Sequence, residues 1–134
     1  MARRTKCLIL FFVFYWIAPL AQASNWQHVT SAPDDGGFDV YVDVESIQVR
    51  GDTREFWDKF VYKTEQEREG KKFIENRIYG RVNCSQQTRT YLIVVSYDRG
   101  GKEVFRYVVS PEMVSVPPGS IGEVVLKFVC GPPK

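Results

Sequence analysis

The stretch that most constrains the fold runs from Phe73 to Asp98 and has the pattern of two strands joined by a short turn. In its first half, apolar residues alternate with polar ones, which is typical of a strand with one buried face. These apolar residues are Ile74, Ile78, Val82 and Cys84. After the polar residues 85–88, residues 89–97 form a second run rich in β-branched and aromatic side chains. We therefore expect an antiparallel hairpin whose last pair is Cys84 with Arg89.

Residues 1–23 have the composition of a cleavable signal peptide. A positively charged start precedes the apolar residues 7–18, and a small-x-small motif predicts cleavage between Ala23 and Ser24. The apolar run is shorter than the ~20 residues that a membrane span needs, so we expect an exported domain, residues 24–134, with no membrane span. No cysteine stands at the cleavage point, so no lipid anchor is indicated.

Removal of the leader changes the charge of the chain. Without Arg3, Arg4 and Lys6, the 18 basic residues fall to 15 against 16 acidic ones, a net charge of −1. Because the apparent basicity lies mostly in the leader, nucleic acid is not an expected partner.

The cysteine count points to one disulfide. The chain has three cysteines, and cleavage removes Cys7. Cys84 and Cys130 are then an even pair in an oxidising compartment, so we expect a structural bridge between them.

Further strands are expected on both sides of the hairpin, over residues 25–30, 38–45, 55–63 and 103–110. The charged segment Glu65–Lys72 is expected to be a solvated loop. All connections are short, which favours a mostly antiparallel sheet of about six strands. Both faces of the central hairpin carry apolar residues, which indicates a partner surface, another layer or a homodimer contact.

The end of the chain has the pattern of a helix. Ser120 and Glu123 have capping-box spacing, and Gly131-Pro132 is a suitable stop. The β-branched residues between them would also suit a seventh strand, but the cap and stop together favour a helix. At helical spacing Cys130 falls away from the apolar stripe, so we expect the helix to end or tighten at residues 128–130. The expected fold class is α+β, a single small domain with one C-terminal helix pinned by a disulfide.

Several short motifs occur in the order of a known family. They are Tyr41-Val42-Asp43 followed by Ser46-Ile47, then Asn83-Cys84, Tyr97-Asp98, and a proline-introduced last segment ending in Cys130. From about Trp26 to Cys130 the chain resembles the surface-adhesin protein E-like family of Gram-negative bacteria. The resemblance implies a small antiparallel sheet with a C-terminal helix fastened by the Cys84–Cys130 bridge. It also implies a surface protein that binds host matrix or serum proteins such as vitronectin and laminin.

The sequence contains no pattern typical of catalysis, of a metal site or of a cofactor site. His28 is the single histidine, and Ser120 lacks the G-x-S-x-G spacing of a nucleophile elbow. Asp34 and Asp35 lack the alternating ligands of a calcium loop. We therefore expect no enzyme activity, no catalytic residues, no metal and no cofactor.

Two sets of residues are candidates for ligand binding. Arg77, Tyr79 and Arg81 share one strand face and form a basic-aromatic strip that could hold sulfated glycans or acidic protein segments. A solvated or dimer-facing strand would have the same pattern. Arg50-Gly51-Asp52 could present an adhesive tripeptide at a hairpin tip, although Gly-Asp is also ordinary turn chemistry.

The sequence thus predicts an exported protein-binding module, resembling surface adhesin E, that acts by surface contact. It would lie in the periplasm, at the cell surface or in the medium. The alternative is a periplasmic structural or assembly domain that binds another envelope protein.

Overall fold

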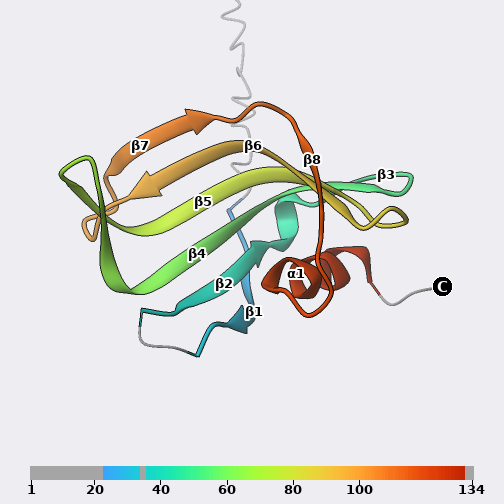
Figure 1. Cartoon of the computed structure of the whole chain (residues 1–134), viewed down its shortest axis with the longest axis horizontal. Helices are drawn as coiled ribbons and strands as arrows, with labels where there is room; N and C mark the ends of the chain where they lie inside the picture. The colour runs from blue at the N-terminus through green and yellow to red at the C-terminus, as the bar shows by residue number, and fades with distance from the viewer. Residues whose placement is uncertain (1–22, 34–35, 132–134) are drawn as a thin grey trace, which may run out of the picture.

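The computed structural model describes residues 23–33 and 36–131, which form one antiparallel sheet with an α-helix on one of its faces (Figure 1). The strands are β1 (Trp26–Ser31), β2 (Phe38–Asp43), β3 (Gln48–Arg50), β4 (Thr53–Arg68), β5 (Lys71–Asn83), β6 (Thr88–Tyr97), β7 (Glu103–Val108) and β8 (Met113–Ser115). The helices are the 3₁₀-helix η1 (Val44–Ser46) and α1 (Ile121–Cys130). Residues 1–22 lie outside the described part, so the signal peptide stays a prediction.

The sheet has the order β1-β2-β4-β5-β6-β7, with β3 added beside β4 and β8 added beside β6. The α+β fold with a mostly antiparallel sheet is confirmed. The eight strands exceed the expected six because β3 and β8 are three-residue strands, too short to show an alternating pattern.

The β4–β5 hairpin is longer than predicted. Glu65–Lys72 is not a solvated loop: β4 continues to Arg68 and β5 begins at Lys71. Only Glu69 and Gly70 form the turn, and both have positive φ. The charged side chains lie on an exposed part of the hairpin, where charge does not oppose strand pairing.

The central β5–β6 hairpin is confirmed, but its predicted register is wrong. Val82, not Cys84, is paired with Arg89. The Asn83 side chain accepts hydrogen bonds from the backbone of Ser85 and Gln86, so Cys84 belongs to the turn. A register shift farther along pairs Tyr79 with Ile93.

Helix α1 begins at the predicted cap, where the Ser120 side chain accepts a hydrogen bond from the Glu123 amide at 3.2 Å. It ends at Cys130, within the expected residues 128–130, and is followed by the C-cap residue Gly131, whose φ is 73°. Cys130 lies one helical turn after Leu126, which is buried. The cysteine therefore lies on the buried side and forms the bridge to Cys84, with a Cα–Cα distance of 5.8 Å.

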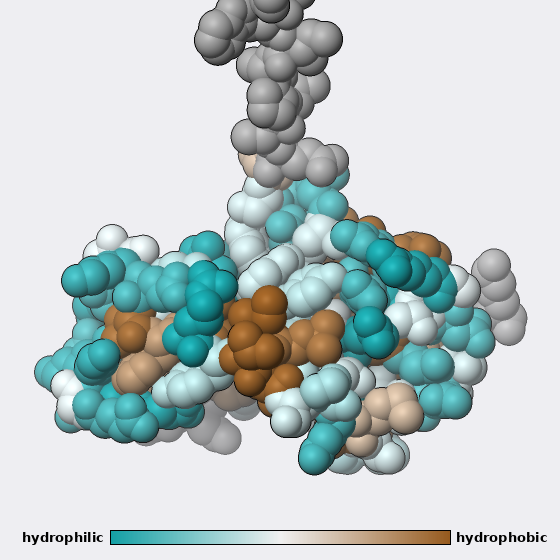
Figure 2. Space-filling model, turned by 90° about the horizontal axis from the view of Figure 1, so that it is seen from above, coloured by the Kyte–Doolittle hydropathy of each residue, from teal (hydrophilic) through white to brown (hydrophobic). Residues whose placement is uncertain are grey.

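The core lies between α1 and one end of the sheet. Val40, Val42, Phe56 and Val82 of the sheet pack against Val125, Leu126 and Val129 of the helix. We call this side of the sheet the inner face and the opposite side the outer face. Seen from above, the surface is largely hydrophilic toward both ends, and hydrophobic side chains gather near its middle (Figure 2). Among the described residues, no helix is long and apolar enough to cross a membrane.

Candidate functional site

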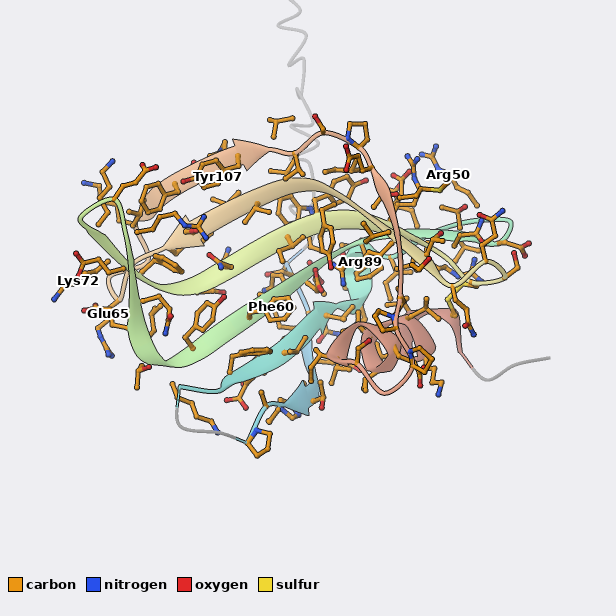
Figure 3. The ribbon with its side chains drawn as sticks, in the orientation of Figure 1. Arg50, Phe60, Glu65, Lys72, Arg89 and Tyr107 are labelled. Carbon is orange, nitrogen blue, oxygen red and sulfur yellow. A yellow bond between two sulfur atoms is a disulfide. The ribbon has the colours of Figure 1, made fainter. Side chains whose placement is uncertain are left out.

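A part of the inner face that α1 leaves uncovered is the main candidate site. In Figure 1 the strands are visible without a covering element between the connection from β8 to α1 and the β4–β5 hairpin tip. Figure 3 shows Phe60 and Arg89 in this region, with Glu65 and Lys72 marking the hairpin tip. We call this surface the trough; its floor is formed by Phe60, Ile78, Tyr91 and Val94, which share the inner face by their strand pairing.

The β4–β5 hairpin forms one end wall of the trough. Arg68 of β4 lies 5.7 Å from the ring of Tyr107 in β7, although β5 and β6 separate these strands in the sheet. The hairpin end must therefore bend across the inner face. The register shift between Val61 and Gln66, where β4 carries extra residues, supplies this bend.

A chain of aromatic contacts runs from the trough into this wall. Its ring centroids are 5.1–6.3 Å apart, the range in which aromatic pairs attract. Its members are Phe38, Phe60, Tyr62, Phe73, Phe105 and Tyr107. Two cations, Arg68 and Lys71, lie over Phe73 and Phe105 at the rim.

An ion pair lies beneath the floor. Arg89 donates from Nη2 to Asp58 Oδ1 at 2.7 Å, and both side chains are almost completely buried. Burial raises the pKa of Asp58, against the opposing effect of the Arg89 charge. The guanidinium also packs on the ring of Tyr91 at 4.7 Å, which joins the buried pair to the exposed floor.

The predicted strip of Arg77, Tyr79 and Arg81 lies on the outer face, because Val82 next to it points into the core. Glu55 accepts hydrogen bonds from Tyr79 at 2.7 Å and from Arg81 at 2.7 and 3.0 Å. The hydrogen bond from Tyr79, followed by those from Arg81, lowers the pKa of Glu55. Burial, followed by the Glu55 contact, raises the pKa of Tyr79.

At the other end of the strip, two cations share one carboxylate. Arg77 lies 4.3 Å from the ring of Tyr97, and its Nε is 3.1 Å from Glu75. Lys59 lies 3.5 Å from Glu75 and 4.6 Å from the ring of Trp26. The outer face is thus a network of paired charges and aromatic rings instead of a cationic strip.

Arg50-Gly51-Asp52 occupies the β3–β4 turn, with both charged side chains exposed. The turn conformation needs Gly51, whose φ is 59°, and the Asp52 carbonyl accepts a hydrogen bond from Cys84 at 2.7 Å. Gly51 and Asp52 border a cavity of about 580 Å³ beside the C-terminal end of α1. The structure does not bring this tripeptide to the trough.

Sequence reasoning missed the trough because its floor residues come from three strands, β4, β5 and β6. The alternation of Ile78 and Val82 indicated a buried face, but α1 covers only the Val82 end of it. Within residues 23–33 and 36–131, no three His, Cys, Asp or Glu side chains come close enough to hold a metal ion.

The fold and these surfaces define a class of small, disulfide-fastened domain in which a single sheet leaves much of both faces uncovered. The family model of surface-adhesin protein E matches residues 26–131. The chain therefore belongs to the surface-adhesin protein E family, as its short motifs predict.

Solved structures of Haemophilus influenzae protein E have the same fold. Crystal form II has a TM-score of 0.58 at 17% identity, with 83% of this chain and 94% of that chain covered. A second structure has a TM-score of 0.57 at 19% identity, with 83% and 90% covered. The selenomethionine form has a TM-score of 0.54 at 20% identity, with 68% and 78% covered. No curated protein matches the sequence significantly.

Proposed function

We propose that the protein is a non-enzymatic adhesin that holds a segment of a host matrix or serum protein in the trough. One observation carries this proposal: no described element covers the aromatic and aliphatic floor beside α1 (Figures 1 and 3). An uncovered apolar surface of this kind marks an interaction site.

The composition of the trough suits a protein ligand. Tyrosine is among the residues that dominate the energetics of protein interfaces, and the floor offers Tyr91, which is 36% exposed, with further apolar groups around it. A segment with one apolar face would cover the floor, as α1 covers the neighbouring part of the sheet. Carboxylates at its edge would meet Arg68 and Lys71, which contact aromatic rings at the rim.

Binding of purified vitronectin and laminin to the exported protein tests the proposal. Tyr91→Asp and Tyr107→Asp place a charge on the floor and at the end wall, and we expect each to weaken binding at least tenfold. Val108→Asp is the matched control, because Val108 is 83% exposed next to Tyr107 on β7 and points to the opposite face. Binding that survives both trough variants would contradict the proposal.

The location of the protein separates the adhesin from the alternative role. An adhesin must be accessible to protease on intact cells or be found in the medium. Protection until the outer membrane is opened would instead favour a periplasmic assembly domain. In that case a photo-crosslinker at residue 91 should capture an envelope protein, whereas one at residue 108 should not.

A further inference from the structure

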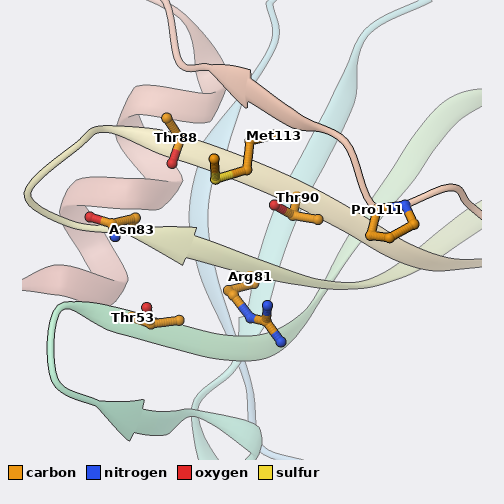
Figure 4. A pocket seen from close by; sticks show the side chains of 7 residues that line it. All are labelled: Thr53, Arg81, Asn83, Thr88, Thr90, Pro111 and Met113. Carbon is orange, nitrogen blue, oxygen red and sulfur yellow. The ribbon is translucent and has the colours of Figure 1, made fainter.

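The outer face carries a small cavity, lined by both polar and apolar groups, that the proposed function does not use. It has a volume of about 260 Å³ and lies on the side of the sheet opposite α1 (Figure 4). Its lining residues are Thr53, Arg81, Asn83, Thr88, Thr90, Pro111 and Met113. Four segments contribute: the beginning of β4, the end of β5, the beginning of β6, and the connection into β8.

The polar groups of the cavity are mainly neutral. Three threonine hydroxyls can each donate and accept a hydrogen bond. The Asn83 side-chain oxygen already accepts three hydrogen bonds from Ser85 and Gln86, which leaves its amino group as a donor. Pro111 and Met113 supply an apolar wall; Met113 is 68% exposed.

The single charged group in the lining is already neutralised. Arg81 makes two hydrogen bonds to Glu55 through Nε and Nη2. An anion entering the cavity would have to compete with this carboxylate. A neutral ligand with several hydroxyls can instead bond to the threonines and to Nη1 of Arg81, which does not bond to Glu55, without breaking the pair.

Two aromatic rings lie next to the cavity along β4 and β5. Trp57 and Tyr79 follow Glu55 and Arg81 on the outer face, two residues or about 7 Å away. Their ring centroids are 5.3 Å apart with an interplanar angle of 37°. Such rings offer flat apolar surfaces, which suit the C–H face of a pyranose ring, while the hydroxyls at its edge stay free for polar contacts.

We propose that the outer face binds a neutral oligosaccharide, with one sugar residue in the threonine-lined cavity and the next against Trp57 and Tyr79. Because Glu55 neutralises Arg81, the charged residue of the lining, the cavity favours a neutral glycan over a sulfated one. The site is independent of the trough, which lies on the inner face.

Titration of the exported protein with N-acetylchitotriose, galactosyl-lactose and a heparin hexasaccharide, followed by NMR, tests the inference. We expect a neutral trisaccharide to shift the backbone amides of Thr53, Thr88 and Thr90 and the Trp57 indole signal. The two neutral probes distinguish an N-acetylhexosamine glycan of the kind found in cell walls from a galactose-containing glycan of the kind found on host cells.

The double variant Thr53→Val/Thr88→Val keeps the side-chain shapes and removes two hydroxyls. We expect it to weaken the binding of the neutral probe at least tenfold while the thermal unfolding midpoint shows that the domain is folded. Tyr91→Asp, on the inner face, should leave glycan binding unchanged. No response to either neutral probe at millimolar concentration, a response to heparin alone, or full binding by the double variant would overturn the inference.

Discussion

Arg89 and Asp58 form an ion pair that joins β6 to β4 across the intervening strand β5, with Nη2 and Oδ1 2.7 Å apart. The exposed fractions of the two side chains are 3% and 0%. Asp58 Oδ2 and Arg89 Nε have no partner within the described residues. A buried pair with unused polar atoms contributes little net stability compared with apolar residues, but it strongly disfavours any arrangement that separates the two charges.

Removal of one partner of this ion pair should therefore destabilise the fold severely. We expect Asp58→Ala to lower the free energy of unfolding by about 3–5 kcal/mol, because it leaves a buried guanidinium without a counter-charge. The double variant Asp58→Leu/Arg89→Met should recover most of this loss. Urea unfolding measures both variants, and a double variant no more stable than the single one would show that the pair itself stabilises the fold.

Loss of the disulfide should destabilise the whole domain. Cys84 and Cys130 are separated by 46 positions, and closure of a loop of that length is worth about 4 kcal/mol in the chain-entropy model. We expect the free energy of unfolding of Cys84→Ser/Cys130→Ser, measured with urea, to be lower than that of the wild type by about this amount. Dithiothreitol should lower the midpoint of the wild type towards that of the variant and leave the variant unchanged; a variant as stable as the wild type would contradict the role of the bridge.

Gly80 is required by the close approach of β6. A Cβ atom at this position would lie 2.7 Å from the Thr90 carbonyl oxygen, next to the register shift of the β5–β6 pair. We expect Gly80→Ala to lower stability by about 1–3 kcal/mol in thermal unfolding.

Gly122 is the matched control for this substitution. Its Cβ would lie 3.4 Å from Val116 Cγ1, an ordinary contact, at the beginning of α1. Gly122→Ala should be neutral or stabilise the protein by up to about 1 kcal/mol, because alanine has the higher helix propensity. Equal losses at both positions would contradict a specific clash at Gly80.

Glu55 should make stability depend on pH in the acid range. The hydrogen bonds from Tyr79 and Arg81 lower the pKa of Glu55 in the folded state, so the unfolded state binds the proton more tightly. The contribution of Glu55 is complete above its ordinary pKa and is lost as the pH falls from there through the lowered folded pKa. We expect the free energy of unfolding of Glu55→Gln to fall less steeply than that of the wild type between about pH 5 and 3. Parallel pH profiles in urea unfolding would contradict this.

The Arg50-Gly51-Asp52 turn is explained by backbone geometry. Gly51 has the positive φ that the turn needs, and Asp52 contributes its carbonyl to Cys84. We therefore expect Asp52→Glu, which keeps the charge, to leave attachment of integrin-bearing cells to the immobilised protein unchanged. Loss of attachment in this variant, with an unchanged unfolding midpoint, would assign the tripeptide an adhesive role.

Much of the fold was predictable because its causes are local. Alternating residues predicted β2 and the body of β5, Ser120 predicted the beginning of α1, and the cysteine count predicted the bridge. The register of the β5–β6 hairpin was not predictable from alternation, because the Asn83 side chain shapes the turn and moves Cys84 out of the strand.

The candidate site was predicted only in part. Arg77, Tyr79 and Arg81 do share one face, as the period of two requires. The two arginines are paired with carboxylates, however, and one of these, Glu55, lies 26 positions from Arg81 in the sequence. Such partners are brought opposite each other by strand pairing, which the sequence does not display.

By itself, the sequence determined where the longer strands lie, where the helix begins and which cysteines pair, since each follows from short-range pattern or simple counting. The tertiary structure alone decided how far α1 covers the inner face, that the β4–β5 hairpin bends back to close the trough, and that Asp58 meets Arg89. These relationships depend on contacts between strands distant in the chain, and their geometry is set by sheet register, twist and packing.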